Sequence, residues 1–251
     1  MSWDWATLLP FIAVGFLAQA IDGALGMAFG IVNSTILVSF MGVSPAVASA
    51  SVHAVETFTT AASGTSHVLH RNVDWRLFRR LMIPGLIGGV LGAYVLAGLD
   101  AAIAKPFVMT YLALVGLYLL YRAWRGAPKV REPRIVGPLG FIGGFLDAIG
   151  GGGWGPVVTS NLLVQGASPR STIGTVNTSE FFLTATISAT FIATMGFAAF
   201  TVATIGILIG GIAAAPFGAV IAKRVPARPL MALVGALLTI TSAYTVVRAI
   251  S

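Results

Sequence analysis

The chain has 251 residues, of which 57 % are hydrophobic and only 9 % are charged, and its mean hydropathy is +0.91. Soluble domains carry about 25 % charged residues because their surface faces water, so the composition excludes a soluble domain and predicts a single membrane domain over residues 1–251. The net charge is +7, and the absence of cysteine excludes disulfides and thiolate metal sites.

The predicted elements are apolar segments of membrane-spanning length, two of which are interrupted by glycine. A broken segment at 7–41 contains "DGALGMAFG", and a second at 135–165 contains "FLDAIGGGGWGP". Each is followed by three uninterrupted segments that are long enough to cross a bilayer core of about 30 Å as helices. These lie near 46–70, 76–98, 104–122, 169–195, 200–222 and 228–247. The sequence therefore predicts an all-α integral membrane protein.

The basic residues lie in or beside the short breaks between these segments, most densely in "RNVDWRLFRR", "YRAWRGAPKVREPR" and "AKRVPAR". Basic residues mark the cytoplasmic loops of membrane proteins, so we attribute the positive charge to topology and expect no nucleic acid as a partner. The N-terminal "MSWDWATLLP" has no basic residue ahead of its apolar run, which favours a retained segment over a cleaved signal peptide. We expect a multi-pass protein of the plasma membrane, the inner membrane of a prokaryote.

The second half of the chain repeats the first. "GFLAQAIDGALG" (15–26) matches "GFIGGFLDAIGG" (140–151), and "GVSPAVASASVHAVETF" matches "GASPRSTIGTVNTSEFF" further along. We therefore define repeat 1 as residues 1–125 and repeat 2 as residues 135–251, each with a broken helical hairpin and three transmembrane helices. The match aligns Asp22 with Asp147, His53 with Asn177, and Glu56 with Glu180.

The loops predict that the two repeats are inverted relative to each other. The loop 71–80 of repeat 1 carries four Arg residues, whereas its counterpart at 195–200, "MGFAAF", has no charge. If basic loops are cytoplasmic, both termini lie outside. Each broken segment then enters and leaves the membrane on the same side, as a re-entrant hairpin or as two short spans. Inverted repeats with broken helices near the midplane are the architecture of secondary transporters.

Four carboxyl side chains lie inside apolar segments, where an ionisable group is costly and therefore a functional candidate. They are Asp22, Glu56, Asp147 and Glu180. Each Glu follows a proline by eleven residues, which at about 1.5 Å per residue puts it roughly 16 Å deep. We interpret the Glu pair as proton-coupling groups, with a structural hydrogen bond as the alternative. The Asp pair is left open between proton coupling and capping of backbone N–H groups in the breaks. His53, one helical turn from Glu56, is placed to tune it or receive its proton.

The breaks also predict a binding site. Irregular backbone at membrane depth survives only where it is buried in protein or lines a wet cavity, and the helix ends that it creates expose N–H groups with a positive dipole end. No Lys or Arg is expected in the membrane core, so an anion would depend on these N–H groups and on nearby hydroxyl and amide side chains. The candidate substrate-binding residues are Gly26, Gly30, Asn33, Ser34, Thr35, His53, Gly151, Gly152, Gly153, Thr159, Ser160, Asn161 and Asn177. A cation would instead use the four carboxyls, so these residues alone leave the charge of the substrate open.

The duplicated "GF…D" element with its glycines, each copy followed by "G[VA]SP…E", resembles the TauE/SafE family of sulfite and organosulfonate exporters over essentially the whole chain. The resemblance implies a permease of the plasma membrane that moves small sulfur-containing oxyanions, such as sulfite or sulfonates, outward. Repeat 1 departs from the glycine-rich pattern, with "GALGMAFG" in place of "GGGGWG", so the two breaks need not bind substrate equally.

Two other functions fit some of these residues. Within transport, the alternative is a carrier for another small solute, such as a cation or an amino acid. Two Asp residues on separate broken segments would also suit an intramembrane aspartyl protease, which needs both carboxyls within reach of one water. The repeat explains the Asp pair without chemistry, so we expect a transporter without catalytic residues, metal or cofactor. Its expected partners are a small anion, protons and the lipid bilayer, and its oligomeric state is not predicted.

Overall fold

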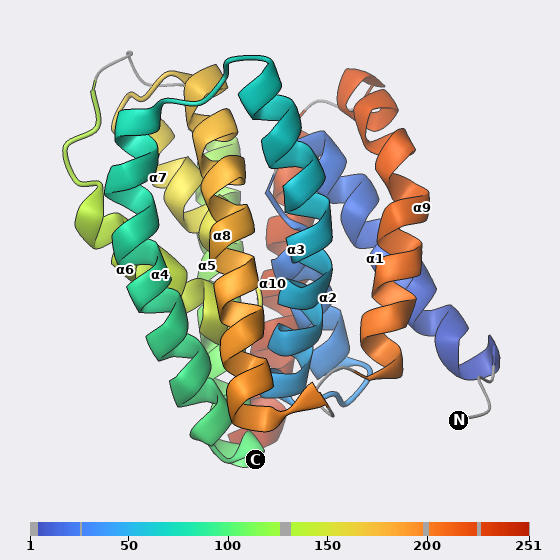
Figure 1. Ribbon diagram of the computed structural model, residues 1–251. Coiled ribbons are helices and arrows are strands. Elements are labelled where there is room, and N and C mark those ends of the chain that lie inside the picture. The colour runs from blue at the N-terminus through green and yellow to red at the C-terminus, as the bar shows by residue number, and fades with distance from the viewer. Residues whose placement is uncertain (1–4, 26, 126–131, 198–200, 225–226, 251) are drawn as a thin grey trace.

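The computed structural model describes residues 5–25, 27–125, 132–197, 201–224 and 227–250, and every regular element in this part of the chain is helical (Figure 1). The predicted all-α integral membrane fold is confirmed. The elements are α1 (Trp5–Leu25), α2 (Phe29–Ser39), α3 (Pro45–Leu69), α4 (Trp75–Gly98), α5 (Ala101–Trp124), α6 (Gly137–Gly150), the π-helical turn η1 (Trp154–Thr159), α7 (Ser160–Val164), α8 (Pro169–Met195), α9 (Val202–Arg224) and α10 (Ala227–Ile250).

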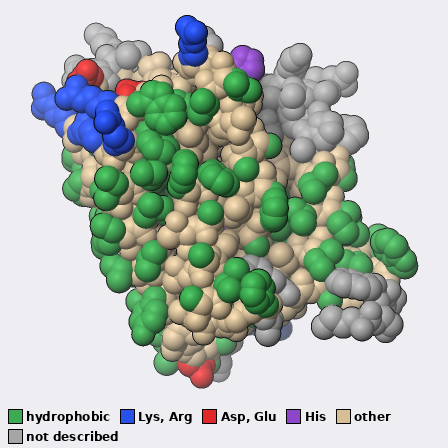
Figure 2. All heavy atoms as spheres, viewed as in Figure 1, with side chains coloured by type: hydrophobic (Ala, Val, Ile, Leu, Met, Phe, Trp, Pro, Cys, Tyr) green, Lys and Arg blue, Asp and Glu red, His purple; other side chains and the backbone are tan. Residues whose placement is uncertain are grey.

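The polar helices α3 and α8 lie in the middle of the bundle and pack against each other, with α4 and α6 on one side and α1 and α9 on the other (Figure 1). Among the described helices, four are long and apolar enough to cross a membrane: α1, α4, α5 and α10. The flank of the molecule carries scattered hydrophobic side chains, and basic side chains gather at the end where α4 begins (Figure 2). An apolar flank with a charged end is the surface expected of a membrane-embedded bundle.

The two predicted breaks are present as interruptions between short helices. The first separates α1 from α2, and the second separates α6 from η1 and α7. Gly151 and Gly152 in the second have φ angles of +63° and +136°, which are left-handed conformations that L side chains rarely adopt. A Cβ on Gly152 would also overlap the backbone of Gly30, so the two breaks touch each other at this point. The glycine run is therefore required by the turn and by the close approach.

Glycines also let the outer helices approach the broken ones. A Cβ on Gly88 of α4 would overlap the carbonyl of Phe141 on α6, and a Cβ on Gly15 of α1 would overlap the carbonyl of Ile207 on α9. Membrane helices pack through small residues of this kind because lipid gives no hydrophobic driving force for association. The α1–α9 and α4–α6 contacts are among the most extensive in the bundle, and they hold the two broken segments in place around α3 and α8.

Candidate functional site

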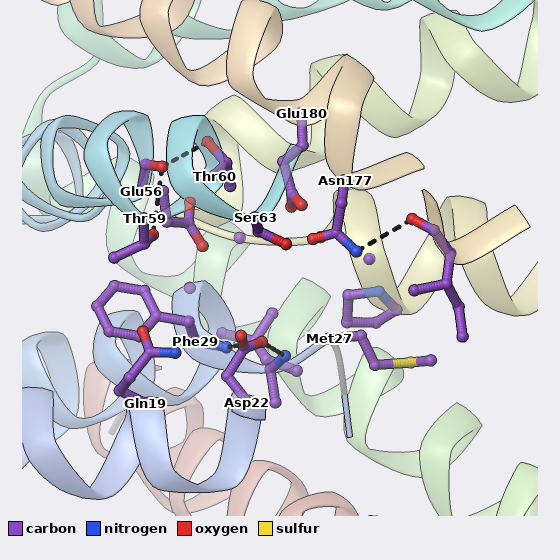
Figure 3. A pocket seen from close by; sticks show the side chains of 18 of the residues that line it. Gln19, Asp22, Met27, Phe29, Glu56, Thr59, Thr60, Ser63, Asn177 and Glu180 are labelled. Carbon is purple, nitrogen blue, oxygen red and sulfur yellow. Dashed lines mark hydrogen bonds between the residues drawn. The ribbon is translucent and has the colours of Figure 1, made fainter. Parts of the chain in front are cut away.

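A cavity of about 280 Å³ lies between α1, α3, α8 and the two breaks (Figure 3). Its lining includes carboxyl, hydroxyl, amide and imidazole side chains and, among the described residues, no Lys or Arg. The carboxyls of Glu56 and Glu180 enter from α3 and α8, and Asp22 faces them from α1 (Figure 3). The polar side chains of the lining are Gln19, Asp22, Glu56, Thr59, Thr60, Ser63, His67, Asn177 and Glu180.

The cavity extends from the middle of α3 and α8 towards one end of the bundle. On α3 its lining runs from Glu56 to His67, in the last turn of the helix. On α8 it runs from Glu180 back to Ile173, in the second turn. The loop that follows α3 packs on this part of α8 through Asn72. The cavity therefore leads towards the loop between α3 and α4, which carries Arg71, and the first turns of α4, which carry Arg76, Arg79 and Arg80.

Asp22 caps the helix that follows the first break. Its Oδ1 atom accepts hydrogen bonds from the backbone N–H groups of Ala28, at 2.7 Å, and Phe29, at 3.1 Å. These are two of the N–H groups that the start of α2 leaves without a partner in the helix. The Asp22 carboxyl therefore binds the backbone N–H groups at this break that the sequence predicts to bind the substrate.

Asp147 caps the second break in the same way and makes one further contact. Its Oδ1 atom accepts a hydrogen bond from the N–H of Trp154 at 2.8 Å, which corresponds in the repeat to the bond between Asp22 and Phe29. Its Oδ2 atom lies 3.1 Å from Nε2 of His53 on α3, and both side chains are almost completely buried. Both Asp residues thus make the contacts that the capping interpretation expects.

Glu56 and Glu180 also face the cavity, from α3 and α8. Glu56 is 6 % exposed, and its Oε2 atom has no hydrogen-bond partner among the described residues. Its Oε1 atom lies beside Gly30, where a Cβ would approach it to 3.0 Å. A buried carboxyl oxygen without a protein partner is available to a proton, a water or a substrate. The two glutamates that the spacing in the sequence singled out therefore line one cavity.

The remaining predicted site residues divide into two groups. Gly30, Gly152, Gly153 and Asn177 line the cavity. The other predicted residues that the structure describes do not line it. Three of them donate side-chain hydrogen bonds to backbone carbonyls: Ser34 Oγ to Gly151 at 2.7 Å, Asn33 Nδ2 to Phe29 at 2.9 Å, and Asn161 Nδ2 to Val157 at 2.7 Å. His53 contacts Asp147, and Thr35, Thr159 and Ser160 are buried. Gly26 lies outside the described residues.

Sequence reasoning missed several side chains of the lining, notably Gln19, Thr59, Ser63 and His67. The signal for two of them was present, because Ser63 and His67 continue the helical spacing of Glu56 and its neighbours by two more turns. His67 lies in the last turn of α3, beside the loop that leads to α4. The structure places it at the cavity end nearest to that loop.

The comparisons with known proteins show the family of the chain. Residues 11–245 match the family model described as "Sulfite exporter TauE/SafE". The chain is 42 % identical over 251 residues to the "Probable membrane transporter protein YtnM" of Bacillus subtilis (strain 168), an alignment that covers 96 % of this chain and 83 % of that relative. No solved structure matches the chain. The protein therefore belongs to the TauE/SafE sulfite exporter family, whose members are membrane transporters and not enzymes.

Proposed function

We propose that the protein is a proton-coupled secondary transporter of small sulfur-containing anions, such as sulfite or organosulfonates, and that the cavity between α3 and α8 is its substrate site. The observation that carries the proposal is the pairing of Glu56 and Glu180 in one cavity whose described lining contains no Lys or Arg. Family membership supplies the class of substrate, and the cavity supplies the coupling groups.

The chemistry of the cavity links an anion to protons. Ionised carboxylates only accept hydrogen bonds, whereas protonated carboxyls also donate. Asp22 and Asp147 already occupy backbone N–H groups at the breaks. An anion in the cavity would therefore be held by hydroxyl and amide groups and by protonated Glu56 and Glu180, and it would be repelled once these carboxyls ionise. Binding of the anion and binding of protons then favour each other.

The shape of the cavity supports a state that is loaded from one side. The cavity leads towards the end of the bundle where α4 begins, which the charge distribution assigns to the cytoplasm. The arginines at this end raise the local concentration of anions. Loading from the cytoplasm and release outside, by alternating access at the prokaryotic plasma membrane with both termini outside, is the cycle that these features favour for an exporter.

Transport by purified protein in proteoliposomes tests the proposal. Sulfite, sulfate, sulfoacetate and taurine should be compared with and without a pH gradient. We expect accumulation of at least one sulfur oxyanion that depends on the gradient and collapses when a protonophore is added. Transport that ignores the pH gradient for every anion would contradict proton coupling.

A carrier for a cation or a zwitterionic amino acid is the second candidate, because Asp22, Glu56 and Glu180 place three carboxyls around the same cavity. The two candidates differ in the response of binding to pH. An anion should bind better as the carboxyls become protonated, and a cation should bind worse. Substrate affinity measured over a pH series, with the anions above and with alkali cations and amino acids, separates them.

A further inference from the structure

We propose that His53 and Asp147 form a second proton-binding site, separate from Glu56 and Glu180, which ties α3 to α6 in the conformation described here. The inference rests on the proposed proton-coupled transport only for its role in the cycle. The presence of the proton follows from the geometry of the imidazole ring.

The first step is the position of one ring hydrogen. Nδ1 of His53 lies 2.8 Å from the carbonyl oxygen of Ser49 and 3.2 Å from its Oγ atom. The Ser49 carbonyl can only accept a hydrogen bond, and the Ser49 hydroxyl donates its hydrogen to the carbonyl of Ala148. Nδ1 therefore carries a hydrogen and donates it towards Ser49.

The second step concerns the other ring nitrogen. A neutral imidazole with its hydrogen on Nδ1 has a lone pair on Nε2. Nε2 lies 3.1 Å from Oδ2 of Asp147, and two lone pairs would repel each other at this distance. A proton therefore lies between the two atoms, either on the ring, as imidazolium and carboxylate, or on the carboxyl, as carboxylic acid and imidazole. Both forms hold one proton more than the deprotonated pair.

The third step is the environment. The side chains of His53 and Asp147 are 0 % and 2 % exposed, so a deprotonated pair could not be hydrated without separating. The titratable groups close enough to interact electrostatically with Asp147 are Glu56 on α3, Tyr111 on α5 and Glu180 on α8. Asp22 on α1 interacts in turn with both Glu residues. All of these are acidic or neutral, so His53 is the cationic partner available to Asp147 among the groups that face it.

The equivalent place in the other repeat cannot hold this proton. Asn177 aligns with His53 and makes the same bond to the residue four positions earlier, from Nδ2 to the Ile173 carbonyl at 3.0 Å. An amide does not take up a proton, and Asp22, the counterpart of Asp147, faces the cavity. The proton-binding pair is therefore present in one repeat and absent from the other. The contact between His53 on α3 and Asp147 on α6 binds a proton, and a movement that separates the two helices releases it.

Histidine-specific NMR tests the site directly. The sequence has three His residues, so ¹⁵N-histidine labelling of the protein in nanodiscs gives few signals, and His53→Asn assigns the one of interest. We expect Nδ1 of His53 to be protonated at neutral pH and Nε2 to be protonated or strongly hydrogen-bonded to an acid. Asp147→Asn should convert this ring to an ordinary neutral imidazole while the signals of His67 and His70 stay in place.

A wild-type His53 ring with its hydrogen on Nε2, or a signal that Asp147→Asn leaves unchanged, would overturn the inference. The wild-type spectrum shows which nitrogen of the His53 ring carries the hydrogen even if the variants fold poorly. Transport supplies a second readout: His53→Asn combined with Asp147→Asn should lower the number of protons moved per substrate by one and keep downhill exchange, whereas an unchanged ratio would remove the site from the cycle. Transport by the wild-type protein that is not coupled to protons would refute the proposed function, but it would not change the protonation of His53 that NMR measures.

Discussion

The first broken segment (α1–α2) and the second (α6–η1–α7) share an acidic residue at the same place, and yet their surroundings differ. Both carboxyls cap the helix that follows the break. Asp147 is 1 % exposed and bound to His53, whereas Asp22 is only partly buried and faces the cavity. The same local motif therefore serves a closed side and an open side of one molecule. The difference goes with the aligned positions on the central helices, where His53 of α3 contacts Asp147 and Asn177 of α8 bonds its own helix.

The helices that pass the two breaks differ in the same sense. Thr59, Ser63 and His67 of α3 line the cavity. The residues that align with them on α8 are Leu183, Ile187 and Phe191, which are 1 %, 0 % and 0 % exposed. The first two pack against Gly89 of α4. The duplicated sequence has thus diverged, so that α3 presents a polar face to the cavity and α8 packs an apolar face at the aligned positions. The predictions below test how far this difference extends.

The largest effect concerns topology, because the comparison depends on the two repeats being inverted. Cysteines replacing Arg79, beside the loop after α3, and Phe197, after α8, should be introduced singly into the chain, which has no cysteine of its own. An impermeant thiol reagent should label the second in intact cells and leave the first unlabelled until the cells are opened. Labelling of both from the same side would remove the inverted arrangement.

Replacement of Glu56 or Glu180 by Gln should abolish accumulation against a gradient. Gln keeps the shape and a hydrogen-bond donor but cannot exchange a proton, so downhill exchange of substrate should persist. Proteoliposomes with and without a pH gradient measure both activities. Glu132→Gln, in a loop away from this cavity, is the matched control. Accumulation by both cavity variants at the wild-type rate would make the carboxyls structural.

Replacement of each Asp by Ala should destabilise the protein to a different extent, with the larger loss at Asp147. Asp147→Ala leaves His53 buried without its partner and should lower the free energy of unfolding by about 3–5 kcal/mol. Asp22→Ala removes a cap and should cost about 1 kcal/mol. Thermal unfolding of both variants in the same detergent gives the comparison. Equal losses would mean that the contact with His53 adds no stability.

A smaller effect is expected from the junction of the breaks. Gly152→Ala places a side chain at φ +136° and against the backbone of Gly30. Strain at such a position costs on the order of 1–3 kcal/mol, and it should also weaken substrate binding. Gly98→Ala is the control, because a Cβ there meets nothing within 4 Å. Melting temperature and substrate affinity should fall only in the first variant, and matched behaviour of the two would place the junction outside the site.

Much of the architecture could be predicted because it depends on local properties of the chain. The helix bounds of α3, α4, α8 and α9 fall within a few residues of the predicted spans, since hydropathy and flanking charges act over short distances. The breaks were recognised from their glycines. Glu56 and Glu180 were also recognised as a pair, because each follows a proline by eleven residues in aligned helices.

The sequence by itself thus determined the membrane class, the bounds of most helices, the breaks and the acidic pair, all of which follow from composition, periodicity and repetition. Only the tertiary structure decided the partner of His53. Along the helix Glu56 is the nearest carboxyl, but the ring contacts Asp147, which lies 94 residues away in the chain. Only the tertiary structure decided, too, that Asp22 and Asp147 occupy backbone donors of the breaks. The physical reason is that a buried polar atom must find a partner in three dimensions, and spacing along one helix does not say which other helix brings it.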